Sequence, residues 1–195
     1  KRALVIAPQW IGDAVMPGPL LRRLQARGGR LTVGALPWVA PVYRAMPQVA
    51  SVVVFPFAHG GLQWGARRQL ARQLRGQFDA AYVCPNSLKS ALLPWWAGIA
   101  KRVGYQGEAR YGVLTDRLPN PPKDQRPPMV AFYSALSGDA DVGQDRPQLQ
   151  LPTALVDATL ADLRVQRQGY YVFAPGAEYG PAKRRAAKQL GLTGR

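Results

Sequence analysis

The 195-residue sequence predicts a doubly wound α/β domain of the Rossmann type. Short apolar runs recur along the chain, and their length and β-branched content suit buried parallel strands. Amphipathic patterns with helical spacing separate these runs. Strands that alternate with helices at such intervals are typical of a parallel sheet covered by helices.

The predicted strands and helices follow one another over the first half of the chain. The strands are expected at residues 3–7, 31–36, 51–55, 79–84 and, much later, 170–175. The helices are expected at residues 14–26, 38–45, 64–75 and 88–97. Pro17 and Pro19 are compatible with the first helix only near its N-terminus, so an irregular start is expected there.

The second half of the chain contains two breaks and then a new βα unit. The proline-rich segment 119–128 predicts an extended surface loop, and the polar segment 137–152 a connection before a helix near 156–166. The stretch YYVFAPGAEYGPAKR then repeats the strand, turn and helix order of the N-terminus. We therefore expect a Rossmann-like domain over 1–150, a connection with a linker helix over 151–168, and the incomplete beginning of a second Rossmann-like domain over 169–195.

The composition indicates an intracellular protein with an anionic partner. Lys and Arg number 26 against 11 Asp and Glu, a net charge of +15, which suits nucleic acid, a membrane surface or a phosphorylated substrate. No apolar run approaches the roughly 20 residues that span a bilayer, and no signal peptide is recognisable. Cys84 and His59 are the single cysteine and histidine, so a disulfide framework and a zinc site of the usual ligands are excluded. Catalysis through His59 is disfavoured because its glycine-rich loop shows no paired nucleophile.

The turn PQWIGD after the first predicted strand is the first candidate site. In open α/β sheets, ligands bind at the carboxyl ends of the strands. Asp13 lies there, as the one acidic residue among the first 78, in company with eleven Lys and Arg. It could act as a helix N-cap, or as an ionised group that accepts a proton. The turn lacks the G-x-G-x-x-G spacing, so dinucleotide binding is not expected there.

Basic residues form the second candidate site. Arg67 and Arg68 begin a run of arginines on the predicted helix 64–75, for which a solvated face is the ordinary interpretation. Lys89 differs, because it follows a strand end and a Pro-Asn-Ser turn at a helix start, where an anion is favoured.

The third candidate is the turn PGAEYGPAKR. Gly176 and Gly180 permit a tight turn whose amides face an anion, and Lys183 follows closely enough to pair with a phosphate. A plain surface loop is the alternative interpretation.

Taken together, four stretches resemble the bacterial ADP-heptose:lipopolysaccharide heptosyltransferases, glycosyltransferase family 9, over roughly residues 4–184. They are APQWIGDAVM, PFAHGGLQWGARRQLARQLR, YVCPNSLKSALLPWWAGIAKRVGYQGEARYGVL and APGAEYGPAKR. The resemblance implies a GT-B architecture, in which an N-terminal Rossmann-like domain holds the acceptor and a C-terminal one the sugar nucleotide. Around PNSLKSALLP it is greatest for the heptosyltransferase II branch. Branches I and III, with other acceptors, and a basic nucleic-acid-binding α/β domain are the alternatives.

The resemblance also implies roles for individual residues. Asp13 would be the base of an inverting transfer of L-glycero-D-manno-heptose from ADP-heptose to the first heptose of the lipopolysaccharide inner core. Acceptor contacts are implied for Arg67, Arg68, Lys89 and Arg110. Contacts to the donor diphosphate are implied for Gly176, Ala177, Glu178 and Lys183. ADP-heptose would be the donor substrate, with no other cofactor and no metal.

The resemblance further implies where such a protein works. Its acceptor would be phosphorylated Kdo-lipid A bearing the first heptose, on the cytoplasmic face of the inner membrane. The anionic leaflet would attract the basic surface, and nucleic acid would not be a partner. After Arg184 the family continues through a Trp-Pro pair into a full second domain, whereas this sequence continues as RAAKQLGLTGR. Most of the donor site is therefore expected to lie outside this chain, which by itself is expected to bind acceptor without transfer.

Overall fold

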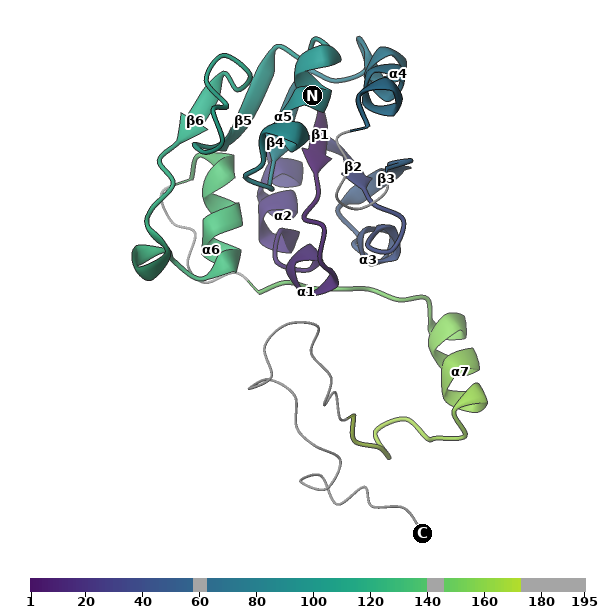
Figure 1. The fold of residues 1–195 in the computed structure, drawn as a ribbon. Coiled ribbons are helices and arrows are strands. Elements are labelled where there is room, and N and C mark those ends of the chain that lie inside the picture. The colour runs from purple at the N-terminus through teal and green to yellow at the C-terminus, as the bar shows by residue number, and fades with distance from the viewer. Residues whose placement is uncertain (58–62, 140–145, 173–195) are drawn as a thin grey trace. The chain divides into compact units, whose positions relative to one another are not determined.

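The computed structural model describes residues 1–57, 63–139 and 146–172. The chain divides into two compact units, residues 1–150 and 151–195. The first unit is built on a six-stranded parallel sheet in the order β3-β2-β1-β4-β5-β6 (Figure 1). Its strands are β1 (Arg2–Ile6), β2 (Arg30–Ala35), β3 (Val49–Val54), β4 (Ala80–Val83), β5 (Lys101–Tyr105) and β6 (Asp116–Leu118). This is the strand order of the Rossmann fold, so the predicted fold class is confirmed.

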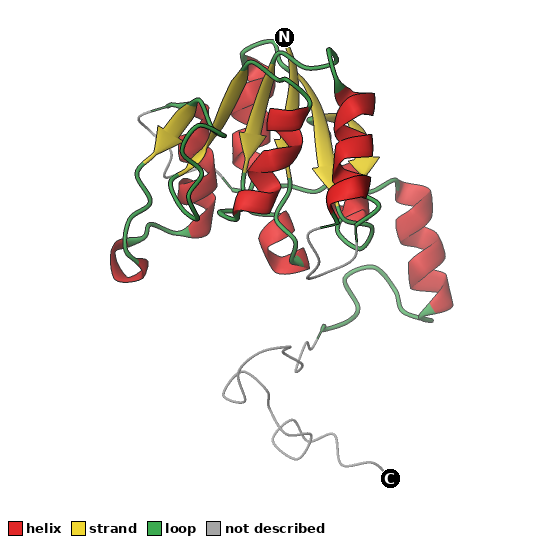
Figure 2. Ribbon diagram, turned by 45° about the horizontal axis from the view of Figure 1, so that its top comes forward, coloured by secondary structure: helices red, strands yellow, loops and turns green. Residues whose placement is uncertain are grey.

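Helices lie on both faces of this sheet (Figure 2). The first unit contains α1 (Ile11–Ala14), α2 (Gly18–Ala26), α3 (Ala40–Arg44), α4 (Trp64–Leu74), α5 (Leu88–Trp96) and α6 (Met129–Ser134), with 3₁₀ turns η1 (Lys123–Gln125) and η2 (Ala135–Ser137). Right-handed crossovers put α2 and α3 on one face and α4 and α5 on the other, because the chain reverses its progress across the sheet after β3. In agreement, α2 packs beside α6, and α4 packs beside α5. The second unit contains α7 (Thr153–Asp162).

Several boundaries differ from the predicted ones. The first predicted helix is two, α1 and α2, because Pro17 is the N-cap of α2 and Pro19 lies in its first turn. The short strands β5 and β6 and the helix α6 were not predicted. Within the predicted strand 170–175, residues 170–172 are not strand and the rest lies outside the described residues.

The core forms around the central strands. Leu4 and Val5 of β1 are fully buried although they point to opposite faces of the sheet, as expected of a strand covered on both sides. On β2, the absence of a side chain at Gly34 leaves the space that the ring of Phe55 occupies. A Cβ at Gly34 would come within 2.2 Å of that ring, so only glycine fits without displacing it.

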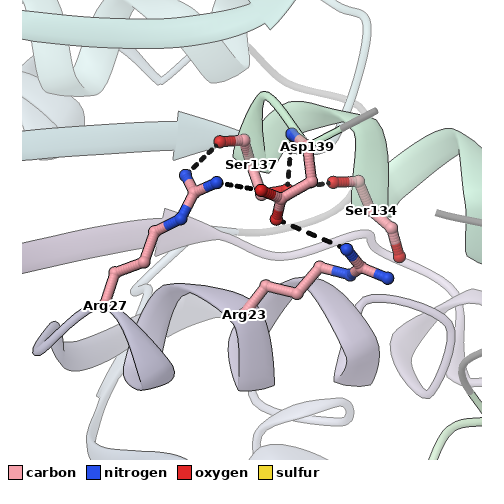
Figure 3. Close-up of polar contacts among 5 residues, drawn as sticks. All are labelled: Arg23, Arg27, Ser134, Ser137 and Asp139. Carbon is pink, nitrogen blue, oxygen red and sulfur yellow. Dashed lines mark hydrogen bonds and ion pairs between the residues drawn. The ribbon is translucent and has the colours of Figure 1, made fainter. Parts of the chain in front are cut away.

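A polar cluster fastens α2 to the segment after α6. Asp139 forms ion pairs with both Arg23 and Arg27 (Figure 3). Arg23 lies in the last turn of α2, and Arg27 follows one turn later as its C-cap. Arg27 also donates to the backbone carbonyl of Ser137, whose hydroxyl lies 2.8 Å from an Asp139 carboxylate oxygen. The Ser137 hydrogen bond and the two guanidinium groups lower the pKa of Asp139. The cluster therefore holds the chain after η2 against the sheet's helical layer.

Candidate active site

A pocket lies at the point where the strand order reverses. β1 and β4 are neighbours, and their following helices leave toward opposite faces of the sheet, which opens a crevice at their carboxyl ends. The pocket there has a volume of about 260 Å³. Its lining comes from the turns after both strands, from the short helix α1, from the start of α5 and from α6, namely Pro8, Gln9, Trp10, Asp13, Pro85, Asn86, Ser87, Lys89 and Tyr133.

Asp13 contributes the carboxylate of this pocket. It is the third residue of α1 and is half-buried. The N-cap of α1 is Trp10, and no side chain caps this helix, so the interpretation of Asp13 as an N-cap is wrong. Within the described ranges, the Asp13 carboxylate makes no hydrogen bond or ion pair. It is therefore available to accept a proton from a bound hydroxyl group.

Two tyrosine hydroxyls lie near this carboxylate. Burial raises the pKa of both Tyr43 and Tyr133, and the nearby Cys84 and Asp13 add to the shift. Both phenols therefore remain protonated at neutral pH. Tyr133 lines the pocket itself and can donate a hydrogen bond there.

Lys89 supplies the positive charge of the pocket. It is the second residue of α5, whose N-cap Ser87 has an extended backbone and makes no side-chain cap hydrogen bond. Within the part of the chain that the structure describes, the Ser87 hydroxyl and the Asn86 side-chain oxygen have no partner. The Lys89 ammonium group at the start of α5 therefore gives the pocket a positive charge beside the positive end of the helix dipole, a combination suited to an anionic ligand.

The turn before α5 is fixed from the neighbouring β5–β6 connection. The carboxylate of Glu108 accepts a hydrogen bond from the backbone N–H of Leu88, at 2.8 Å. Arg110 donates from Nη1 to the Pro85 carbonyl oxygen, at 3.0 Å. The hydroxyl of Ser90 lies 2.6 Å from the Ser87 carbonyl oxygen and 3.2 Å from that of Pro85. These contacts fix the position of the backbone that carries Lys89.

Arg110 itself is not placed at the pocket surface. Its side chain is fully buried against Gly104, where a Cβ would come within 2.7 Å of Nη2. Burial lowers the pKa of Arg110 to about 10, and Glu108 opposes that shift, so the guanidinium is charged at neutral pH. Arg110 therefore contacts the pocket through Pro85 rather than directly.

The two adjacent arginines of α4 have different surroundings. Arg67 is buried with its guanidinium 4.1 Å from the ring centre of Phe57, and donates to the Lys89 carbonyl oxygen at 3.4 Å. Together with Lys89 it lines a second cavity of about 20 Å³, room for one water molecule. Arg68 is exposed and lies over Trp96. The structure therefore brings Asp13 and Lys89 together, with Arg67 behind Lys89, and Arg68 elsewhere.

The predicted donor-site residues Gly176, Ala177, Glu178 and Lys183 lie outside the described residues. In the described ranges, no three His, Cys, Asp or Glu side chains gather as metal ligands would. None of the helices described there is long and apolar enough to cross a membrane.

Among the pocket residues that the sequence interpretation did not name are Asn86, Ser87 and Tyr133, and it also missed Glu108, which supports the turn. Asn86 and Ser87 belong to the Pro-Asn-Ser turn that drew attention to Lys89, so their position at a helix start was a usable signal. Tyr133 comes from α6, which is distant in sequence and was not predicted. Glu108 lies in a turn with a left-handed backbone, φ +39°, which no local pattern indicated.

Comparisons with known proteins agree on one family. The family described as glycosyltransferase family 9 (heptosyltransferase) matches residues 67–189. Lipopolysaccharide heptosyltransferase 2 of Escherichia coli K12 is 41% identical over 94% of this chain and 56% of its own length. Lipooligosaccharide heptosyltransferase 2 of Haemophilus influenzae is 37% identical over 93% of this chain and 56% of its own length. The chain thus spans little more than half the length of these relatives.

Solved structures show the same relationship. The structure of E. coli ADP-heptose lps heptosyltransferase II superimposes with a TM-score of 0.81 and 37% identity, over 97% of this chain and 61% of that one. A glycosyltransferase family 9 protein from Veillonella parvula superimposes with a TM-score of 0.70 over 85% of this chain and 50% of that one. At 14% identity, this second likeness concerns the fold alone.

Proposed function

Because the chain belongs to glycosyltransferase family 9, the heptosyltransferase family, we propose that it forms the acceptor-binding part of an inverting heptosyltransferase. The reaction is transfer of L-glycero-D-manno-heptose from ADP-heptose to the first heptose of the lipopolysaccharide inner core. The names of the relatives support this acceptor, since those at 36–41% identity are heptosyltransferases 2 of lipopolysaccharide or lipooligosaccharide.

The observation that carries the proposal is the shared pocket of Asp13 and Lys89. Asp13 takes the proton of the acceptor hydroxyl while that oxygen bonds to the anomeric carbon of the donor. The bond from that carbon to the diphosphate breaks at the same time, ADP leaves with its electron pair, and the configuration inverts. A carboxylate on α1 that makes no hydrogen bond or ion pair within the described residues is suited to accept this proton and to orient the hydroxyl.

Lys89 binds an anionic group of the same acceptor. The acceptor carries phosphates and acidic Kdo sugars, and a lysine at a helix N-terminus favours such groups. The protonated Tyr133 hydroxyl, which lines the same pocket, donates to an acceptor oxygen. Binding and base catalysis are thereby assigned to separate residues of one pocket.

The donor side of the proposal rests on residues beyond the described ranges. By its resemblance to the family, Lys183 stabilises the charge of the leaving ADP with the amides near Gly176 to Glu178, so that no metal cofactor is needed. The protein works at the cytoplasmic face of the inner membrane, where its acceptor is anchored.

Acceptor specificity provides the test. An enzyme of the relatives' length carrying this sequence is assayed with ADP-heptose and two truncated lipopolysaccharides, one ending in the first heptose and one ending in Kdo. We expect transfer to the first, and transfer to the Kdo-terminated acceptor instead would assign the protein to another branch. The 195-residue chain alone is expected to bind the acceptor that ends in the first heptose. As a control, Asp124→Asn in the exposed turn η1 is expected to leave that binding unchanged.

A further inference from the structure

A cluster of tryptophans lies on the outer surface of α4 and α5, apart from the pocket. Trp64 and Trp95 are 49% and 45% exposed, although tryptophan side chains are usually largely buried. With Arg68 and the half-buried Trp96 they form what we call the Trp–Arg patch. None of these four residues lines the pocket of Asp13, so the proposed reaction does not account for their exposure.

The patch is an organised surface. The ring centres of Trp64 and Trp96 are 5.2 Å apart, and those of Trp95 and Trp96 are 6.5 Å apart. The guanidinium of Arg68 lies 5.3 Å from the ring centre of Trp96 and 6.0 Å from that of Trp64. These contacts hold large apolar rings and a cation side by side at the surface.

The charge around the patch has one sign. α4 and α5 contain no Asp or Glu, and Arg72 and Arg75 continue the basic surface of α4, both exposed. Between Trp64 and Trp96 the sequence has a single acid, Asp79, which is bonded to the backbone N–H of Arg2. An anionic partner therefore meets no repelling carboxylate on these two helices.

We propose that the Trp–Arg patch docks the protein on an anionic lipid bilayer. Tryptophan is favoured at the membrane–water interface, where its ring lies among the headgroups, and arginine is attracted by anionic lipids. The inference rests on the proposed function, since an acceptor embedded in a membrane must be reached at that surface. Beyond the proposed function, the inference identifies which face of the domain contacts the membrane.

The geometry favours lipid over nucleic acid as the occupant. Proteins that bind single strands offer aromatic faces on which bases stack. In the patch, Trp64 and Trp96 are tilted against each other by 49°, and Arg68 lies over both rings. A bilayer interface needs no open ring face, because it accepts an indole ring by its apolar area and its N–H group.

The test measures binding of the 195-residue chain to vesicles. Sedimentation with vesicles of phosphatidylethanolamine and phosphatidylglycerol is compared with vesicles of phosphatidylcholine. We expect binding to the anionic vesicles that weakens as salt is raised, and much weaker binding to the neutral ones. Trp64→Ser with Trp95→Ser should lower the partition coefficient at least about tenfold. Arg68→Gln with Arg72→Gln should lower it about fivefold for each arginine replaced.

A matched pair elsewhere provides the control. Tyr111, which is 70% exposed, has the guanidinium of Arg117 at 4.9 Å from its ring centre, the same chemistry outside α4 and α5. Tyr111→Ser with Arg117→Gln should change partitioning less than about twofold, because screening limits the effect of charges distant from the bilayer. Equal losses in the control and patch variants would overturn the proposal. So would wild-type partitioning in both patch variants, or loss of single-stranded RNA binding in them without loss of vesicle binding.

Two further measurements separate this proposal from the proposed function. Circular dichroism and the melting transition check that each variant is folded. Binding of a water-soluble inner-core oligosaccharide without acyl chains should be unchanged in Trp64→Ser with Trp95→Ser. If vesicle binding does not depend on the patch while oligosaccharide binding depends on Lys89, the docking surface is wrong and the proposed function stands.

Discussion

The buried guanidinium of Arg110 donates a hydrogen bond from Nη1 to the carbonyl oxygen of Pro85, at 3.0 Å. This contact joins the connection after β5 to the turn after β4, which carries the basic side of the candidate active site. Within the described residues, Nε and Nη2 of Arg110 have no partner. A buried cation with so few hydrogen bonds contributes little to stability, so its value lies in fixing the turn.

Replacing Arg110 by methionine tests this positioning role. Arg110→Met keeps most of the side-chain volume and removes the hydrogen bond to Pro85. The free energy of unfolding in urea should change by no more than about 1 kcal/mol, because the loss of one hydrogen bond is offset by removal of Nε and Nη2, two buried nitrogens without a partner among the described residues. Acceptor binding should weaken several-fold, since the turn loses its fixed position. Arg117→Met removes an exposed arginine as a charge control, and equal binding by both variants would contradict the role.

Asp13→Asn separates base catalysis from packing. Asparagine has nearly the size of aspartate but cannot accept the proton. In an enzyme of the relatives' length, kcat should fall about 100-fold or more while acceptor and ADP-heptose still bind. The melting transition should be unchanged, because among the described residues the carboxylate makes no hydrogen bond or ion pair that the amide would lose. A near-normal kcat in the folded variant would reject Asp13 as the base.

Lys89→Ala tests the anion contact. If Lys89 binds the acceptor before and during the reaction, its loss weakens ground state and transition state alike. The acceptor KM should therefore rise about tenfold while kcat changes much less. A tenfold rise is the effect expected from loss of one hydrogen bond to a charged group. Lys123→Ala, on exposed η1, is the matched control. An unchanged acceptor dependence would make Lys89 a surface lysine.

The Asp139 cluster predicts a dependence of stability on pH. The Ser137 hydroxyl and the Arg23 and Arg27 guanidinium groups lower the pKa of Asp139 in the folded chain. The unfolded chain therefore takes up a proton first as pH falls, and the stabilisation, complete at neutral pH, is lost through the acid range. Asp139→Asn should lower the melting temperature at neutral pH. In this variant the melting temperature should also fall less steeply as the pH is lowered toward about 3. Asp124→Asn should leave that decline unchanged.

Much of the fold could be predicted from the sequence. Apolar runs of five or six residues identified the parallel strands, and in β1 burial on both faces removes the alternation of a half-exposed strand. The location of Asp13 and Lys89 could be predicted as well. Each lies at the start of the helix that follows a strand, and the carboxyl ends of parallel strands meet at one edge of the sheet. The edge strand β6 could not be found this way, because its three residues, DRL, are exposed or half-buried.

Which residues surround that edge was decided by tertiary structure. Arg67 and Arg68 look equivalent in sequence, but one residue turns a helix by about 100°, and the packing of α4 on α5 decides which arginine is buried. Arg67 consequently packs on Phe57, and Arg68 on Trp96. Tyr133 and Arg110 reach the site through contacts between segments distant in sequence. Such contacts depend on how elements pack, which no local pattern encodes, whereas the order of strands and helices depends on burial and spacing, which the sequence carries directly.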